Sequence, residues 1–168
     1  PPSWEPAPEP SPVPVFTHEP LPPAAAVDAR VAERFLQQAT FGPTQASMQD
    51  VMVNGPARWF VQQLHVPAGG LADGYDSGAV RAQLFMKMAN GQDQLRQRMA
   101  FALSQTLAVS TNKLVNGYEL IPWVRLLENH AFGNYRTLLR EVTLSPSMGK
   151  FLDLANSTGT GGLAPNEN

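Results

Sequence analysis

The sequence predicts an all-α fold, and three observations support this. Apolar residues recur at spacings of three and four over most of the chain after residue 23, which is the period of a helix that buries one face. No window shows sustained alternation of apolar and polar residues, the pattern of a half-buried strand. Residues that cap or stop helices separate the apolar stretches. We therefore expect an array of about seven short-to-medium helices.

The N-terminal segment differs from the rest of the chain in its high proline content. Its first 23 residues hold ten of the sixteen prolines. Proline fixes φ and removes a backbone donor, which favours extended structure over a helix. We predict a disordered proline-rich linker or tether over residues 1–23 and a helical part over residues 24–168. Trp4 and Phe16 leave open the alternative that the segment is a docking peptide for a groove on a partner.

The helical pattern is clearest near the C-terminus, where Asn134 can cap one helix and a Ser-Pro corner at Pro146 separates it from the next. Earlier helices are predicted over Ala24–Thr40, Thr44–Val53, Pro56–Leu64, Ala79–Ala89, Asp93–Val109 and Tyr118–His130. The helix over Asp93–Val109 is the most apolar of these, and we expect it to be the longest, central and mostly buried.

For several side chains in these helices, the sequence predicts burial, a position in the helix or an ion-pair partner. Trp59, Phe60 and Leu64 form the expected buried side of their helix. Methionine adapts to irregular gaps, so Met86 and Met88 are expected in or near the core. Pro122 is expected in a first helical turn, where a missing donor costs least. Arg96 and Arg98 are expected to pair with carboxylates, with an anion-binding role as the alternative; the candidate partners are Glu119, Glu128 and Glu141.

Composition excludes several classes of function. The formal net charge is −2 and the pI is about 5.9, so the chain lacks the basic surface that nucleic-acid binding requires. No apolar run approaches the ~20 residues of a transmembrane helix. The absence of cysteine excludes disulfides and thiolate metal sites. The chain begins Pro-Pro-Ser without a signal peptide, and we expect that its natural N-terminus is missing.

No catalytic or cofactor motif stands out. His18, His65 and His130 lie far apart, and no two of them have the spacing that would place two metal ligands on one helix face. There is no motif for a nucleotide, haem or zinc, so cofactors stay unassigned and no metal site is predicted. His65 is expected to interact with the dipole at a helix C-terminus rather than to bind a ligand.

Four segments together resemble a bacterial family known only as domain of unknown function 1800. They are ARVAERFLQQATFGPT at Ala29–Thr44, LRQRMAFALSQTLAVS at Leu95–Ser110, AFGNYRTLLREVTLSPSMGKFLDLANS at Ala131–Ser157 and PNEN at Pro165–Asn168. Their order is similar to that of the N-terminal third of the family. The resemblance implies that the chain is a fragment that stops inside the PNEN motif and that more helical sequence follows Asn168.

The resemblance also implies a large, mainly helical bacterial protein that is exported to the periplasm, envelope or exterior. It implies a possible sulfatase-like partner protein of a second family of unknown function, 1501. Many family members carry Trp-His-Asn-His-Phe where this chain reads Leu-Ser-Gln-Thr-Leu at positions 103–107. Ser104 and Thr106 replace the two histidines, so any chemistry that those histidines perform is not expected here.

The residues that match Asn-Glu-Asn are the remaining site candidates, with Glu167 as the candidate catalytic carboxylate and Asn166 and Asn168 as ligand-binding amides. Such a group can hold a cation or a substrate hydroxyl, and it can equally cap a following helix. Arg98 matches a family arginine and is a candidate partner of Glu167.

Two alternative hypotheses for the function follow from the sequence. The first is an envelope-associated binding or scaffolding protein, which the proline-rich segment and the missing catalytic motifs favour. The second is a hydrolase that acts on an extracellular polymer, with a site completed by residues beyond Asn168. Whether the protein is an enzyme is left open.

Overall fold

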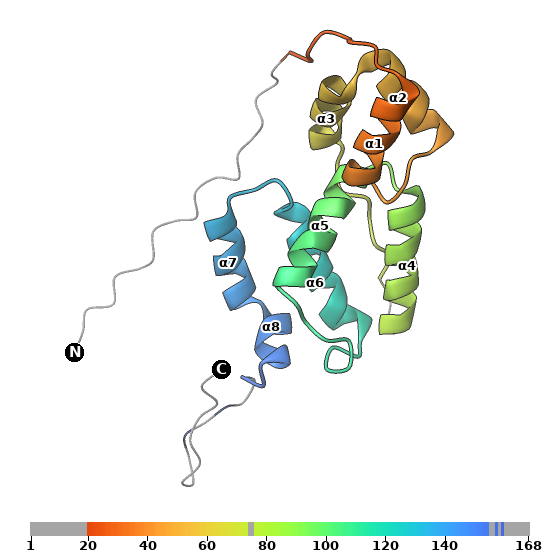
Figure 1. Cartoon of the computed structure of the whole chain (residues 1–168). Helices are drawn as coiled ribbons and strands as arrows, with labels where there is room; N and C mark the ends of the chain where they lie inside the picture. Colours follow the sequence, from red (N-terminus) through yellow and green to blue (C-terminus); the bar gives the residue numbers. More distant parts are fainter. Residues whose placement is uncertain (1–19, 74–75, 155–156, 158, 160–168) are drawn as a thin grey trace, which may run out of the picture.

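The computed structural model describes residues 20–73, 76–154, 157 and 159. In this part the chain forms eight helices and no strand, so the predicted all-α array is confirmed (Figure 1). The helices are α1 (Ala29–Ala39), α2 (Gln45–Asn54), α3 (Pro56–His65), α4 (Ser77–Asn90), α5 (Gln94–Thr106), α6 (Gly117–Asn129), α7 (Tyr135–Leu144) and α8 (Pro146–Phe151). The predicted linker over residues 1–23 lies almost entirely outside the described residues.

Helix ends follow the capping residues of the sequence. The side chain of Thr44 accepts a hydrogen bond from the N–H of Ser47 and starts α2 in a capping box. Asn134 caps α7 in the same way, through the N–H groups of two following residues. Pro56 and Pro146 occupy the first turns of α3 and α8, where the missing N–H has no partner to lose. These local signals were therefore read correctly from the sequence.

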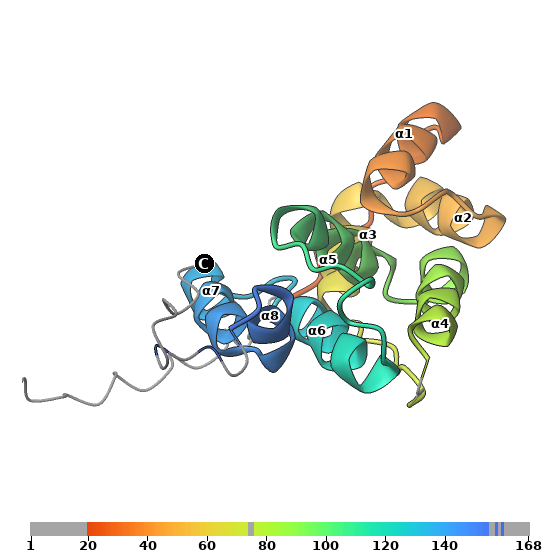
Figure 2. The same cartoon turned by 90° about the horizontal axis from the view of Figure 1, so that it is seen from below.

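Helix α5 lies in the middle of the molecule. Helices α1, α2 and α3 gather at one end, α4 lies on one side, and α7 and α8 lie on the other (Figures 1 and 2). Leu95 of α5 belongs to a core cluster with residues of α1, α2 and α3, whereas Ala100 belongs to a second cluster with residues of α6 and α7. A third cluster joins Val80 of α4 to α6. Helix α5 thus connects the two larger parts of the core.

The segment before α1, which we call the N-terminal strap (residues 20–28), is bonded to the end of α2. Backbone N–H groups of Ala25 and Val27 donate to the carbonyls of Asn54 and Met52, at 3.2 and 3.0 Å. Gly55 ends α2 with φ at +82° and lies so close to the strap that a Cβ at this position would overlap the carbonyl oxygen of Ala25. Glycine is required here by both its backbone angle and its lack of a side chain.

The predicted buried faces were partly wrong. Phe60 is 43% exposed, because α3 packs on its neighbours through Trp59, whose ring meets Phe35 edge-to-face at 5.3 Å. Met86 is 62% exposed, because α4 contacts α6 through the side that carries Val80 and Leu84. Helical periodicity shows which residues share a face, and it does not show which face a neighbouring helix covers.

Helix α5 is central but shorter and more exposed than predicted. It ends at Thr106 and is one residue shorter than α4. Its buried residues are Leu95, Gln97 and Ala100, whereas Phe101 is 40% exposed. The prediction for Pro122 was also wrong: α6 begins at Gly117, so this proline lies beyond the first turn. Within the described part of the chain, no helix is long and apolar enough to cross a membrane.

Candidate functional site

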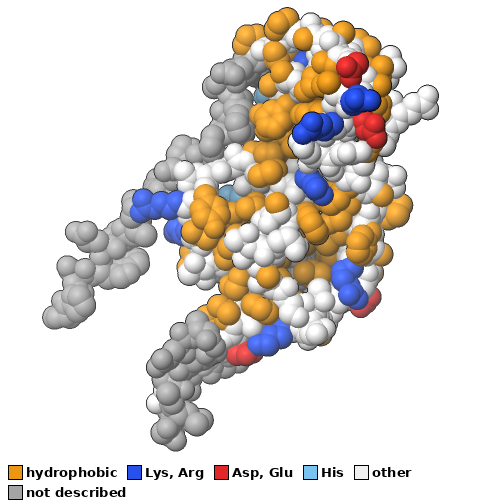
Figure 3. Space-filling view, viewed as in Figure 1, with side chains coloured by type: hydrophobic (Ala, Val, Ile, Leu, Met, Phe, Trp, Pro, Cys, Tyr) orange, Lys and Arg blue, Asp and Glu red, His pale blue; other side chains and the backbone are white. Residues whose placement is uncertain are grey.

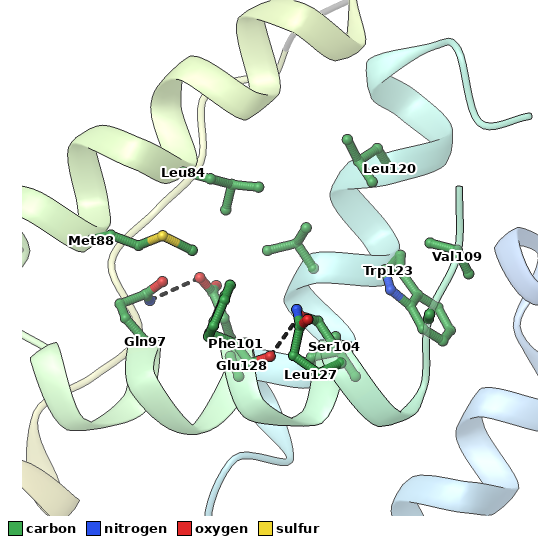
Figure 4. A pocket seen from close by; sticks show the side chains of 14 residues that line it. Leu84, Met88, Gln97, Phe101, Ser104, Val109, Leu120, Trp123, Leu127 and Glu128 are labelled. Atoms are coloured by element: carbon green, nitrogen blue, oxygen red, sulfur yellow. Dashed lines mark hydrogen bonds between the residues drawn. The ribbon is translucent and has the colours of Figure 1, made fainter. Parts of the chain in front are cut away.

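A half-open cavity of about 350 Å³ lies between α4, α5 and α6, and we call it the α4–α6 pocket (Figure 4). Its lining is mainly apolar and includes two aromatic rings. The lining residues are Leu84, Met88, Gln97, Ala100, Phe101, Ser104, Gln105, Ala108, Val109, Leu120, Trp123, Val124, Leu127 and Glu128. A mainly apolar cavity of this size with a few polar groups is typical of a binding site for a small molecule.

Trp123 is the largest side chain that lines the α4–α6 pocket. The residue is 3% exposed, and the edge of the indole ring that carries the nitrogen faces into the pocket (Figure 4). Within the described part of the chain, its N–H makes no hydrogen bond. The indole nitrogen is not among the fully buried atoms of the described residues that lack a partner, so it is accessible from the pocket as an unused donor.

Glu128 forms the charged end of the pocket, and its carboxylate is 2% exposed. Lys87 of α4 donates to its Oε1 from 2.6 Å, and the Nε2 of Gln97 on α5 donates to the same oxygen from 2.9 Å. Gln97 also donates to the buried carboxylate of Asp93, at 2.8 Å. These bonds join α4, α5 and α6, which explains why a charged group can be buried there.

The buried polar network continues into the loop before α4. The backbone N–H of Gly69 donates to Oδ2 of Asp93 at 3.0 Å, and Lys87 donates to the carbonyl of Gly69. Both carboxylates of the network are therefore held by internal donors. We interpret the network as the scaffold that fixes one end of the pocket, since each of its charged groups is already hydrogen-bonded within the chain.

Arg96 lies behind this network. Its guanidinium donates to the backbone carbonyls of Glu128 and Val66, at 2.9 and 3.2 Å, and lies over the ring of Phe132. The expected pairing of Arg96 with a carboxylate oxygen was therefore wrong, although Glu128 is the residue that it contacts. Burial lowers the pKa of Arg96, while the nearby charges of Asp93 and Glu128 act in the opposite direction.

The polar stretch at positions 104–106 lies at the end of α5. Ser104 Oγ donates to the carbonyl of Phe101 at 2.6 Å, as the expected local bonding of a helical serine predicts, and accepts from Gln105 at 3.2 Å. Ser104 and Gln105 line the α4–α6 pocket, whereas Thr106 is exposed and does not. Two of the three residues of this polar stretch thus lie at the pocket.

Three of the four site residues proposed from the sequence cannot be placed relative to Arg98, since only Arg98 belongs to the described residues. Asn166, Glu167 and Asn168 lie outside the described residues. Arg98 is described, and its guanidinium lies over the ring of Phe41 at 5.3 Å, with no carboxylate bonded to it in the described part. The expected carboxylate partner among Glu119, Glu128 and Glu141 is therefore wrong for Arg98, because its side chain points toward the α1–α2 connection. In the same part, no three acidic or histidine side chains are placed to hold a metal ion.

A second hollow of about 500 Å³ lies between α2, α3 and the α4–α5 turn. Its amide side chains hold these elements together. Gln63 donates to the carbonyl of Gln92 and accepts from the N–H of Leu95, and Gln94 donates to three carbonyls at the end of α4. Because these polar groups are bonded within the chain, the α4–α6 pocket is the better candidate for a ligand site.

Comparison with known proteins identifies the family. A family model described as protein of unknown function (DUF1800) matches residues 34–168. The chain belongs to this family. The matched residues include every residue that lines the α4–α6 pocket, so the pocket is part of the DUF1800 region. No curated protein and no solved structure matches the chain.

Most residues that build this DUF1800 pocket carry no sign of a site in the sequence. Trp123 lies in an apolar helical stretch, where it reads as a core residue, and Lys87 carries no motif. The one usable signal was the polar triplet at positions 104–106 within an apolar helix, and ordinary hydrogen bonding of serine and threonine to their own helix is enough to account for two of these residues. The hydrolase hypothesis, with Glu167 as its candidate carboxylate, rests on the sequence alone.

Proposed function

We propose that this protein is a binding protein that holds a small, mainly apolar ligand in the α4–α6 pocket. The observation that carries the proposal is the pocket itself: a cavity of about 350 Å³ whose lining is largely apolar and whose one end is fixed by the bonded carboxylate of Glu128. Phe101 lines the pocket and is 40% exposed, and Phe85 on α4 is 70% exposed. Exposed aromatic residues beside a cavity favour binding over a purely structural role.

The surface around the pocket supports the same proposal. Apolar side chains reach the surface over α4 and α5, with few charged groups among them (Figure 3). Within the described residues, Glu128 is the only charged group of the lining. An apolar site of this kind gains binding free energy mainly from removing apolar surface from water.

The cellular setting is part of the proposal. We place the protein in the bacterial envelope or outside the cell, because the family resemblance points to export and the proline-rich segment suits a tether. A sulfatase-like protein is the partner that the resemblance suggests. Fractionation of the source cells tests the location, and recovery in the cytosolic fraction alone would contradict it. Co-purification of a sulfatase-like protein from the envelope fraction tests the partner.

Two matched substitutions of an alanine by phenylalanine test the ligand site. Ala108 lines the pocket, whereas Ala102 is exposed on α5 and does not line it. We expect Ala108→Phe to block part of the cavity and to weaken binding of a neutral apolar probe, acetophenone, by at least about tenfold. Ala102→Phe should leave the affinity unchanged. Calorimetric titration gives both affinities.

The proposal fails if acetophenone shows no saturable binding to the unmodified chain, or if both phenylalanine variants weaken binding equally. Equal weakening would mean that the probe adheres to apolar surface in general. Thermal unfolding of each variant shows that the comparison is between folded proteins.

A further inference from the structure

The α4–α6 pocket contains a hydrogen-bond donor that the described chain does not use. Trp123 is 3% exposed, its N–H makes no hydrogen bond within the described residues, and the nitrogen faces the cavity (Figure 4). Among the described residues, the fully buried side-chain atoms without a partner are Nε of Arg58 and Nε of Arg96, so the indole nitrogen of Trp123 stays accessible from the cavity. An accessible donor that the described chain does not use can bond to an acceptor that enters the pocket.

The other polar groups of the pocket are already engaged. The amide of Gln97 donates to Asp93 and Glu128, and the hydroxyl of Ser104 donates to the backbone of its own helix. The amide of Gln105 donates to Ser104 and lies in an exposed residue at the mouth. The indole N–H of Trp123 is thus the side-chain donor inside the pocket that remains for a ligand.

The charge of the lining further restricts the charge that a ligand of this pocket can carry. Among the lining residues, the one charged side chain is Glu128, and no lysine or arginine lines the cavity in the described part of the chain. An anionic group entering this site would lose its hydration without meeting a cation. A neutral acceptor such as a carbonyl oxygen avoids that cost.

We infer that the α4–α6 pocket selects neutral, mainly apolar ligands that carry one carbonyl-type oxygen, which accepts a hydrogen bond from Nε1 of Trp123. This inference rests on the proposed function and adds the chemical class of the ligand. The cavity of about 350 Å³ corresponds to the liquid volume of about twelve water molecules, so the ligand has on the order of a dozen non-hydrogen atoms.

Three probes of equal size separate the features of this ligand class. Acetophenone carries a carbonyl oxygen, α-methylstyrene has a methylene group in the same place, and benzoate carries a negative charge. The chain has three tryptophans, at positions 4, 59 and 123, so the indole region of its proton–nitrogen NMR spectrum contains three signals. Trp123→Phe assigns one of them by its loss.

Trp59→Phe is the matched control. Trp59 is 4% exposed and lies in the other core cluster, with α1, α2 and α3. Both substitutions keep an aromatic ring and remove an indole N–H. Only the variant at position 123 removes the donor that faces the α4–α6 pocket.

We expect acetophenone to bind about 2- to 12-fold more tightly than α-methylstyrene, which is the range of one net hydrogen bond. Saturation with acetophenone should move the Trp123 indole proton signal downfield, and benzoate should bind more weakly than either neutral probe. In Trp123→Phe the two neutral probes should bind equally. In Trp59→Phe the preference for acetophenone should persist.

Three results would overturn the inference, and they differ in what they say of the proposed function. Equal binding of acetophenone and α-methylstyrene to the unmodified chain would leave the pocket as an apolar site without a preference for an acceptor. Saturable binding of none of the probes would reject both the inference and the proposed function. A preference that survives Trp123→Phe would assign the acceptor to another donor.

Discussion

Glu128 shows how a single buried charge organises this protein. Its carboxylate is 2% exposed and accepts hydrogen bonds from Lys87 on α4 and Gln97 on α5, while its backbone carbonyl accepts from Arg96. Removing one partner of a buried pair leaves the other charge without compensation, which costs more than the pair contributes. The Lys87–Glu128 pair therefore fixes α4 relative to α6, whatever its net contribution to stability.

Replacing Lys87 tests this role. We expect Lys87→Met to lower the free energy of unfolding by about 3 to 5 kcal/mol, because Glu128 stays buried without its cation. Adding Glu128→Gln to the same chain should recover part of the loss, since the remaining group is neutral. Urea unfolding followed by circular dichroism gives the three free energies.

Lys113→Met is the control for this measurement. Lys113 forms an ion pair with Asp153, and the two side chains are 43% and 69% exposed. Exposed pairs contribute roughly 0 to 1 kcal/mol, so this variant should change stability little. A similar loss in Lys87→Met and Lys113→Met would contradict the special role of the buried pair.

Residues of this network illustrate what the sequence did not reveal. Arg96 and Glu128 were both named as members of possible ion pairs, but the actual bond runs to a backbone carbonyl. Asp93 and Lys87 were not named as partners of anything. Such pairings join residues of α4, α5 and α6, and only the three-dimensional packing of these helices determines them.

At the scale of elements, Glu119 holds the last helix in place. It completes the capping box at the start of α6, its carboxylate forms an ion pair with Lys150 of α8, and its backbone carbonyl accepts a hydrogen bond from Ser147 at 2.7 Å. The hydrogen bond from Lys150 lowers the pKa of Glu119, opposed by burial and assisted by hydrogen bonds from Asn116. The charged form of Glu119 therefore stabilises the attachment of α8.

This lowered pKa predicts how stability depends on pH. A carboxylate whose pKa is lower in the folded state contributes stability that is fully present above its unfolded pKa and is lost as the pH falls through its folded pKa. We expect Glu119→Gln to destabilise the protein at about pH 7 and to have a much smaller effect at about pH 3. Thermal unfolding at both pH values measures the difference.

Glu141→Gln serves as the reference variant for the pH series. Glu141 lies on α7 and forms an ion pair with its exposed neighbour Arg140. Its substitution should have a small effect at both pH values. If the effect of Glu119→Gln stays the same between the two pH values, the lowered pKa is not what attaches α8.

Helix boundaries were the part of this fold that the sequence predicted best. Thr44, Pro56, Asn134 and Pro146 act locally, and each lies at the expected helix start. The exposure of Met86 was not predictable in the same way, because it depends on which side of α4 meets α6. Capping is a property of a few neighbouring residues, whereas burial is a property of the assembled helices.

At the scale of the whole molecule, α5 belongs to both large parts of the core. Leu95 packs with α1, α2 and α3, and Ala100 packs with α6 and α7. A helix shared in this way couples the two clusters, because neither can lose its packing without exposing a side of α5. The two parts are therefore expected to unfold together.

The tryptophans test this coupling in a single sample, since Trp59 and Trp123 report on different clusters. During urea unfolding, the folded-state indole NMR signals of both residues should disappear with the same midpoint. Loss of secondary structure, followed by circular dichroism, should share that midpoint. Clearly separate midpoints for the two signals would mean that α5 does not couple the clusters.

The candidate site was accessible to sequence reasoning only in part. The polar residues at positions 104 and 105 could be recognised as unusual within an apolar helix, and both line the α4–α6 pocket. The pocket itself could not be recognised, because it combines residues of α4, α5 and α6. A cavity is set by distances between helices, and periodicity contains no information on those distances.

The N-terminal strap also determines how this protein bears mechanical load. A pulling force applied to the chain before residue 20 reaches the folded part through the strap, which Ala25 and Val27 bond to the end of α2. The hydrogen bond from Arg58 of α3 to the carbonyl of Pro22 resists the force first, followed by those two hydrogen bonds and the cap of α1 at Asp28. The α4–α6 pocket is built from helices beyond these bonds, so tension on the strap can be carried by α1 and α2 while the pocket keeps its shape.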